Sequence, residues 1–376
     1  MIGDETVPPP ENSSTLEFVD QTFLFESVGV LLASPNVPAE TFNRHLMALF
    51  EPLLASVSKA PSGAVSEVVL THSIAAMGHM TKGCSASIFN DNAAARTCLV
   101  SAVSTVIGII PVAVQSSEVL SKIILFLHQM VTCLGEGILE KAPEFILNLA
   151  RTDDLKTMKL TLLLLNQLLA RFRGSCAAPL DGMLSKLMER ISHVIQNGQP
   201  SVEEFLETEQ EDLQRAFLSM VAGIINYDCQ AVLTSASNLP HLGAILQAVL
   251  TSCATENSSI QKLAFSIFKR MVDMWGGAGF ADFDQFASQH VTVACLQAPM
   301  RPSFDVADGQ CALVLAEIAN LQLALANKYG DDFVAYLRAF LPTVNLAPEL
   351  VEEYCGLVGG PDIKFKTFFK SLFAAK

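Results

Sequence analysis

The sequence predicts an all-α fold, an α-solenoid of HEAT-like antiparallel helix pairs that stack into an ARM-like superhelix. Three observations predict this class. Apolar residues recur with helical spacing, turn signals interrupt them at intervals of roughly 15 to 25 residues, and strand-type alternation is rare. Of the 376 residues, 51% are hydrophobic and 16% are charged, which excludes a disordered chain and supplies a large core.

The first predicted pair joins residues 16–33 to a second helix that follows the turn Ser34-Pro-Asn-Val. Pro38 occupies a first-turn position, where the missing N–H has no helical partner to lose. One face of the second helix carries an apolar stripe, which consists of Phe42, Leu46, Leu49, Phe50, Leu53 and Val57. Such a stripe needs a neighbour, so we expect each pair to bury its apolar face on the next pair.

The remaining pairs follow in chain order. Their predicted ranges are 62–82 with 91–110, 114–134 with 138–150, 153–172 with 178–197, 201–226 with 240–254, 258–275 with 281–298, 307–329 with 331–342, and 347–357 with 361–374. The unit repeats at roughly 40 to 54 residues, near the HEAT period. We therefore expect a polar, Pro-containing N-terminal segment at residues 1–14 and one solenoid over residues 15–376.

Signals at the helix ends support this division. They are first-turn acids at Asp153 and Asp154, a capping box at Ser201 and Glu204, an N-cap at Asp305, a helix end at Gly330, and helix starts at Pro348 and Pro361. An acidic run at residues 203–212 falls in the first turns of one helix, where negative charge interacts favourably with the helix dipole. We expect this run to be a solvated face, and a basic partner surface is the alternative.

The composition also limits the chemistry. Nine cysteines, an odd number, lie widely spaced in apolar helical runs, so we expect buried thiols in a reducing compartment. His72 and His79 lie seven residues apart without a third ligand at metal-binding spacing, and no C-x-x-C pattern occurs. The sequence has no nucleophile elbow, phosphate loop or H-E-x-x-H motif. We therefore predict no cofactor, no metal and no enzyme, with a helical enzyme as a minor alternative.

A membrane reading is also disfavoured. Residues 99–114 are the one candidate span, and this stretch is shorter than the roughly 20 apolar residues that a bilayer requires. Residues 1–14 have neither the basic region nor the apolar region of a signal peptide. We expect the chain to stay on the cytosolic or nuclear side.

Several runs are not required by a generic helical repeat. They are WGGAGFADF at 275–283, ACLQAP at 294–299, FDVADGQ at 304–310, DQTFLFESVG at 20–29, SPNVP at 34–38 and DIKFKTFFK at 362–370. In these runs the chain resembles the C-terminal portion of exportin-T, the tRNA exportin family of the importin-β or karyopherin superfamily. Ten residues identify the family and are expected to be structural: Trp275, Gly276, Gly277, Phe280, Asp282, Phe283, Pro299, Phe304, Asp305 and Asp308.

The resemblance implies a nuclear export receptor that shuttles between nucleus and cytoplasm. It implies folded tRNA as cargo, GTP-bound Ran as a cooperating partner, mainly through N-terminal repeats without counterpart here, and contacts with nuclear pore proteins. Family members are more than twice as long, so we expect a partial chain. A HEAT scaffold or a karyopherin for protein cargo is the alternative.

A tRNA site on this chain must be a local basic surface, because the formal net charge is −14. The cations expected to contact phosphates are Lys186, Arg190, Lys364, Lys366 and Lys370. Lys186 and Arg190 are spaced by four residues and share one helix face, as do Lys366 and Lys370. We expect the helices that carry these cations to be the second helices of their antiparallel pairs. Second helices usually line the inner surface of a solenoid. Single lysines on helices otherwise serve solubility.

Overall fold

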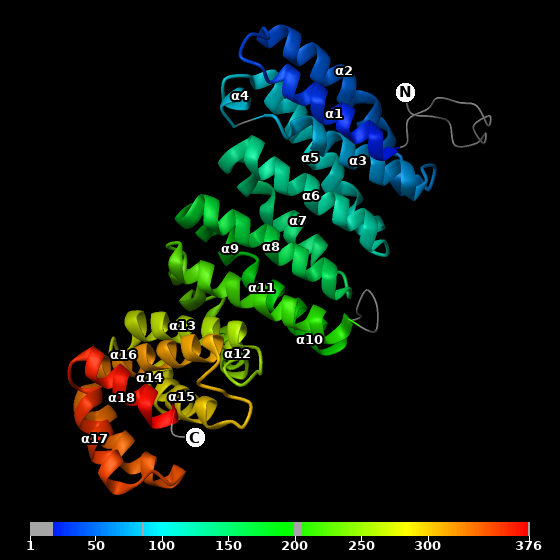
Figure 1. Cartoon of the computed structure of the whole chain (residues 1–376). Helices are drawn as coiled ribbons and strands as arrows, with labels where there is room; N and C mark the ends of the chain where they lie inside the picture. The colour runs from blue at the N-terminus through cyan, green and yellow to red at the C-terminus, as the bar shows by residue number, and fades with distance from the viewer. Residues whose placement is uncertain (1–17, 85, 199–204, 375–376) are drawn as a thin grey trace. The chain divides into compact units, whose positions relative to one another are not determined.

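The computed structural model describes residues 18–84, 86–198 and 205–374, and within these ranges the regular structure is helical, without a strand. The predicted all-α class is confirmed. The chain divides into two compact units, the first ending at Leu164 and the second beginning at Leu165, within one helix (Figure 1). The helical pattern alone did not indicate this division. Residues 1–14 and the Ser201 capping box lie outside the described residues.

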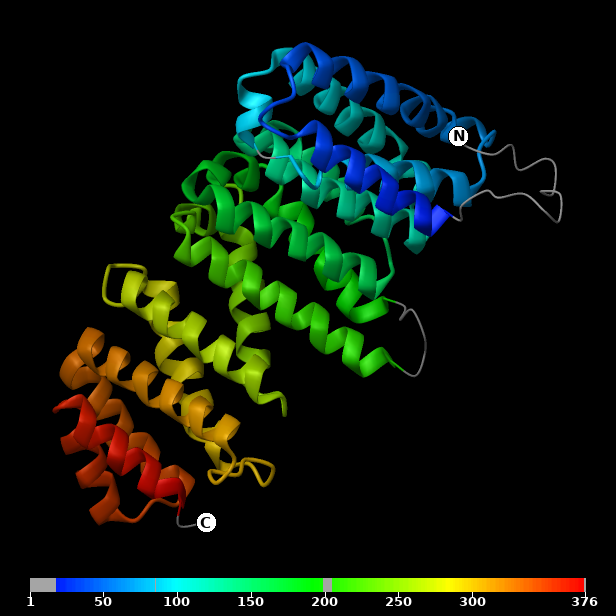
Figure 2. The ribbon, with the colours of Figure 1, turned by 45° about the horizontal axis from the view of Figure 1, so that its top comes forward.

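The described residues of the first unit form seven α-helices and the start of an eighth. Their bounds are α1 Phe18–Leu32, α2 Ala39–Ser58, α3 Glu67–Thr81, α4 Ala86–Asn90, α5 Ala93–Ala113, α6 Ser117–Leu134, α7 Ala142–Leu149 and α8 Leu155–Phe172. Helices α1, α3 and α6 lie side by side in one row, and α2, α5 and α7 form a second row packed against it (Figure 2). These rows are the predicted stack of antiparallel pairs.

The sequence sets the local structure of these helices. Polar N-caps start α3, α5 and α6, where the side chains of Ser66, Asn92 and Ser116 accept the N–H groups of the residues three positions on. The predicted stripe of α2 is buried at Phe42, Leu46, Phe50, Leu53 and Val57. The apolar face thus packs inward, as its spacing predicts.

Helix α1 approaches α3 unusually closely. A Cβ atom on Gly29 would lie 1.9 Å from the backbone oxygen of Met80, and one on Gly83 would lie 2.8 Å from the Cα of Val30. Neither distance is compatible with a side chain, so only glycine permits this backbone contact. Glycine therefore fixes the spacing of the first two helices in the row.

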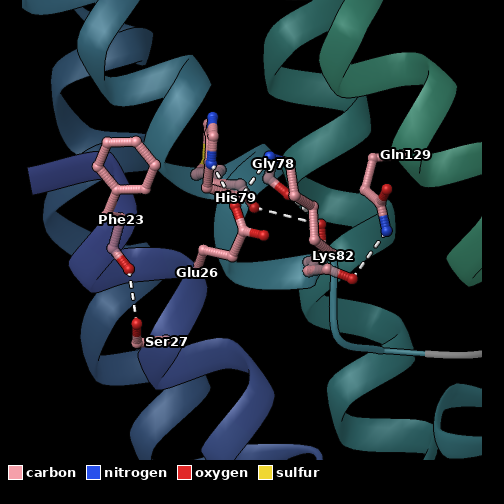
Figure 3. Close-up of polar contacts among 9 residues, drawn as sticks. Phe23, Glu26, Ser27, Gly78, His79, Lys82 and Gln129 are labelled. Carbon is pink, nitrogen blue, oxygen red and sulfur yellow. Dashed lines mark hydrogen bonds and ion pairs between the residues drawn. The ribbon is translucent and has the colours of Figure 1, made fainter. Parts of the chain in front are cut away.

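A polar cluster joins the same two helices. Figure 3 shows Glu26 of α1 directed at His79 of α3 and at Lys82, which directly follows α3, while Phe23 lies apart from this cluster. The Glu26 carboxylate accepts hydrogen bonds from Lys82 Nζ at 2.8 Å and from His79 Nδ1 at 3.0 Å. On the other side of α3, Gln129 of α6 donates to the Thr81 carbonyl at 2.8 Å. Polar contacts thus connect all three helices of the row.

This cluster predicts a pH dependence. The hydrogen bond from Lys82, followed by that from His79, holds the pKa of Glu26 below its ordinary value of 4.5. A carboxylate with a lowered pKa stabilises the fold above that ordinary value, and the contribution is lost as the pH falls through the folded-state pKa. Because Glu26 is partly exposed, the contribution is roughly 0.2 to 1 kcal/mol.

The measurement compares wild type with Glu26→Gln by urea unfolding over a pH series. We expect the wild type to be more stable at neutral pH and the difference to vanish in acid. A difference that grows as the pH falls would contradict this assignment.

In the part of the second unit that the structure describes, ten further α-helices follow the end of α8. Their bounds are α9 Ala177–Asp181, α10 Leu184–Asn197, α11 Leu206–Asn226, α12 Leu239–Ser252, α13 Ser258–Trp275, α14 Ala281–Phe286, α15 Thr292–Gln297, α16 Gly309–Phe340, α17 Pro348–Val358 and α18 Asp362–Ala374. One row of this unit consists of helices that each pack on the next: α11 on α13, α13 on α16, and α16 on α18. Helix α12 packs on α13, and α17 packs on both α16 and α18.

Two predicted helices of this unit are interrupted, and two others are joined into one kinked helix. The helix expected at 178–197 is broken at Gly182 and Met183 into α9 and α10. The helix expected at 281–298 contains a π-helical turn, Ala287–Val291, between α14 and α15. Gly330 has φ 54° and ψ −130°, so it kinks α16 at the predicted helix end without a connecting loop.

The membrane expectation needs a correction. By length and composition alone, three described helical stretches are long and apolar enough to cross a bilayer: Ala93–Ala113, Ser117–Leu149 and Gly309–Val344. Residues 99–114 are therefore not the one candidate span. The helix that contains most of them, α5, is also long enough to cross a bilayer, because it runs for 21 residues. In the fold, α5 packs against α2 and α6, and α16 packs against α13, so apolar residues of these helices face neighbouring helices.

Candidate nucleic-acid interface

Helix α10 presents the first predicted pair of cations. Leu184, Leu187, Met188 and Ile191 are buried on its inner face. Lys186 is exposed and Arg190 is half-buried beside it. The buried face fixes the rotation of the helix, so Lys186 projects into solvent where an anion can reach it.

Helix α18 presents the other three cations. Phe365 and Phe369 are fully buried against Tyr354 of α17, with ring centroids 5.3 and 6.0 Å away. Lys364, Lys366 and Lys370 are exposed on the rest of the surface of α18. By helical spacing, Lys366 and Lys370 share one flank of the aromatic stripe and Lys364 lies on the other.

Four of these five cations, the lysines, form no ion pair with a carboxylate in the described part of the chain. They are Lys186, Lys364, Lys366 and Lys370. By contrast, Arg338 on α16 forms a two-pronged pair with Glu352 on α17, at 2.9 and 3.1 Å. Exposed lysines without such a pair remain available for phosphate contacts.

The five residues form two clusters. Helix α10 packs against α9, whereas α18 packs against α16 and α17. Helix α18 thus continues the row of α11, α13 and α16 and is not only the partner of α17. The structure keeps Lys186 with Arg190 and gathers Lys364, Lys366 and Lys370 on one helix.

A third polar surface was missed by the sequence analysis. A groove of about 390 Å³ lies between α11, α13 and α16, lined on its polar side by Asn226, Ser266, Lys269, Arg270, Glu317 and Asn320. Lys269 pairs with Asp273 at 2.7 Å, and Asn320 donates to Glu317 at 3.3 Å. Nothing in the sequence spacing marks this set, because its members come from three helices that only packing brings together.

The family-identifying run at 275–283 forms a turn in which aromatic rings pack together. The Trp275 ring meets those of Phe280 and Phe283 edge-on, at centroid distances of 5.9 and 5.3 Å. Gly277 and Gly279 have φ values of +66° and +86°, which favour glycine. A Cβ atom on Gly276 would lie 2.7 Å from the Val272 carbonyl oxygen. The expected left-handed turn with an aromatic wedge is therefore present.

The carboxylate that secures this turn is Asp284, which the sequence analysis did not single out. It accepts the Gly277 N–H at 3.0 Å and the Tyr329 hydroxyl at 2.7 Å, so it joins the turn to α16. Burial, together with the bond to Asp284, raises the pKa of Tyr329, so the phenol remains a donor. Asp282, named from the sequence, lies exposed in the first turn of α14.

The turn before α16 requires a second correction. The N-cap of α16 is Asp308, whose carboxylate accepts the N–H groups of Gln310 and Cys311 at 3.1 and 2.9 Å. These hydrogen bonds lower the pKa of Asp308, and the bond from the Cys311 N–H has the largest effect. Asp305, the expected N-cap, instead accepts the Ala307 N–H within the preceding turn. Pro299 and Phe304 are buried beneath this segment.

Most thiols are buried, and His72 and His79 each lie against packed groups of the first unit. All nine cysteines are reduced thiols, of which eight are buried and Cys98 is half-buried. Burial, followed by the neighbouring Cys133, raises the pKa of Cys84 to about 12. His79 is held by Glu26, and burial lowers the pKa of His72. In the described part of the chain, no group of three or more His, Cys, Asp or Glu side chains could hold a metal ion.

Comparison with known proteins shows which family the sequence matches. A family model described as Exportin-T matches residues 3–376. The Exportin-T of Homo sapiens is 27% identical over 390 residues, which cover 97% of this chain and 40% of that protein. The Exportin-T of Danio rerio is 25% identical (97% and 39% covered), and that of Aspergillus clavatus is 28% identical (98% and 39%). The chain thus spans about 40% of the length of these relatives, in their C-terminal portion.

The paired-helix fold and these matches define a karyopherin, a helical-repeat receptor of nuclear transport. The chain belongs to the exportin-T family. This is a family of nuclear export receptors and not of enzymes.

Proposed function

We propose that this chain contributes a tRNA-binding surface to a nuclear export receptor that moves between nucleus and cytoplasm. Membership of the exportin-T family carries the proposal. The exposed lysines of α18 and α10 support it, because phosphate contacts need cations with reach and no particular motif. Folded RNA helices are read through their backbone shape, which suits a receptor for many tRNAs.

GTP-bound Ran and nuclear pore proteins are the further partners that we propose for the complete receptor. If Ran and tRNA both favour one conformation of the receptor, each raises the affinity for the other by the same factor. We assign the main Ran contacts to receptor segments outside this chain. The acidic run at residues 203–212 stays a solvated face in this proposal, and the HEAT scaffold for protein cargo remains the alternative.

The test is filter binding of labelled tRNA across a salt series. We compare wild type with Lys366→Glu/Lys370→Glu, and the control is Lys59→Glu/Lys156→Glu, which makes the same change of charge at exposed positions of the first unit. Each lost phosphate contact lowers the slope of log affinity against log salt by roughly 0.7 to 0.9, so the first variant loses about 1.5 units of slope.

The control variant is expected to keep the wild-type slope. Equal losses in both variants would show that only net charge matters and would contradict the α18 site. Salt-insensitive binding to a protein ligand, without tRNA binding by the wild type, would favour the scaffold alternative.

A further inference from the structure

A groove crosses three successive helices of the second unit. It has a volume of about 390 Å³ and is lined by residues of α11, α13 and α16, and we call it the three-helix groove. Ile225 and Ile267 belong to its lining and are buried, and the polar side chains named above complete it. A concave surface of this size that combines apolar lining with a few polar groups is typical of a ligand site.

Two asparagines stand at the two sides of the groove. Asn226 comes from α11 and Asn320 from α16, and α13 packs on both of these helices. An asparagine side chain offers two N–H donors and one acceptor oxygen. Asn320 donates one N–H group to Glu317 at 3.3 Å, and the side chain of Asn226 has no hydrogen-bond partner among the residues that the structure describes. Donors and acceptors of both kinds are therefore left for a ligand.

The charges in the groove nearly balance. Lys269 is paired with Asp273 at 2.7 Å. Arg270 is exposed and forms no ion pair with any carboxylate that the structure describes. Glu317 on the neighbouring α16 is half-buried and contributes a negative charge. A polyanion is attracted by Arg270 and repelled by Glu317, so the groove suits RNA less well than the lysines of α18 do.

The span of the groove fits an extended peptide. Packed helices have axes about 8 to 10 Å apart, so the distance from α11 across α13 to α16 is roughly 16 to 20 Å. An extended chain rises about 3.3 Å per residue, so roughly five or six residues cover this distance. Each residue of a peptide backbone carries one donor and one acceptor, which are complementary to the free groups of the two asparagines.

We propose that the three-helix groove binds an extended peptide of about six residues that carries an acidic side chain. Asn226 and Asn320 hydrogen-bond the peptide backbone at the two sides, and Arg270 binds the carboxylate between them. An arginine holds a carboxylate through two parallel hydrogen bonds, which makes this contact both strong and selective. The groove thus takes a protein ligand in addition to the RNA proposed for α18, and neither proposal depends on the other.

The test starts from random hexapeptides displayed on phage and selected on the full chain. We expect the selected peptides to share an Asp or a Glu at one position. The consensus peptide is then synthesised with a fluorescent label, and its affinity is measured by fluorescence anisotropy. A version with lysine at the acidic position is measured beside it and is expected to bind the wild type about tenfold more weakly.

Arg270→Glu is the central variant. It is expected to bind the acidic peptide about tenfold more weakly than wild type and to prefer the lysine version, because the cation of the site becomes an anion. A mere loss of folding would weaken both peptides and could not reverse the preference. The matched control is Lys262→Glu, which makes the same change of charge at an exposed position of α13 outside the groove lining.

Lys262 lies roughly 12 Å from Arg270 along the helix, beyond the screening length of about 8 Å at physiological salt. The control is therefore expected to keep the wild-type affinity for both peptides. A further variant, Asn226→Ala, tests the backbone contact. It is expected to weaken both peptides by a similar factor, about threefold or more, without changing the preference for the acidic one.

Several results would overturn the proposal. They are a selection without a shared acidic position, peptide affinities that Arg270→Glu or Asn226→Ala leaves unchanged, and an equal loss in the Lys262→Glu control. Loss of tRNA filter binding in Arg270→Glu, without peptide binding by the wild type, would assign the groove to RNA instead. Lys366→Glu/Lys370→Glu is expected to keep the wild-type peptide affinity, so failure of the α18 site and failure of the groove are distinguishable.

Discussion

Replacing Phe283 with alanine is expected to lower the free energy of unfolding of the second unit by about 3 to 5 kcal/mol. The side chain is fully buried and lies edge-on to Trp275 at 5.3 Å and stacked on Phe280 at 6.4 Å. Its removal leaves a cavity in the wedge that positions the turn before α14. Trp275 is the single tryptophan of the chain, so its fluorescence in urea follows this unit directly.

The matched control is Phe280→Ala. Phe280 belongs to the same cluster but is partly exposed, so its loss forfeits less burial and leaves no closed cavity. We expect a decrease of about 1 to 2 kcal/mol for this variant. Equal urea midpoints for the two variants would show that Phe283 is not the anchor of the turn.

The second large effect is expected from Gly29→Ala. The new methyl group would lie 1.9 Å from the Met80 carbonyl oxygen. Because the helical backbones of α1 and α3 fix the positions of both groups, α1 must move away from α3. Forced overpacking of this kind costs about 1 to 3 kcal/mol or more. Far-UV circular dichroism in urea measures the loss, and amide hydrogen exchange is expected to accelerate first in α1.

Gly108→Ala is the control in the same unit. Gly108 lies exposed within α5, and a Cβ atom there would have nothing within 4 Å. Alanine is favoured over glycine inside a helix by about 0.8 to 1 kcal/mol, so this variant is expected to gain stability. The two Gly→Ala changes thus have opposite expected signs, and a neutral Gly29→Ala would disprove the close approach of α1 and α3.

Helical periodicity predicted most of the fold. The stripe from Phe42 to Val57 is buried as expected. Helix α17 begins at Pro348, and α18 begins directly after Pro361. These features depend on local spacing and on the missing N–H of proline, which a single sequence displays. Family membership was likewise visible in short runs such as 275–283.

Other features depend on tertiary packing and left no such signal. Two aspartates, Asp305 and Asp308, stand close enough to the start of α16 to cap it, and backbone geometry selects the second. Asp284 joins its turn to α16 because it accepts a hydrogen bond from Tyr329, a residue 45 positions later in the chain. The π-helical turn at 287–291 has no sequence marker that periodicity could detect.

The candidate site shows the same limit. Sequence spacing found cations that share one helix face, such as Lys366 and Lys370, because that relation is local. It did not find the groove of Asn226, Arg270 and Asn320, which exists only where three helices meet. Composition does not reveal whether α18 contacts RNA, because net charge does not describe local charge, and the filter-binding comparison tests that contact directly.

The placement of the cysteines has a practical consequence for experiments on this molecule. Reagents for sulfur attack the thiolate, and burial disfavours that form at Cys84, Cys253 and Cys295. Modification at these positions therefore waits for the surrounding helices to open, and its rate reports how often they do. The chain thus carries its own reporters of local breathing, distributed over both units and requiring no engineered label.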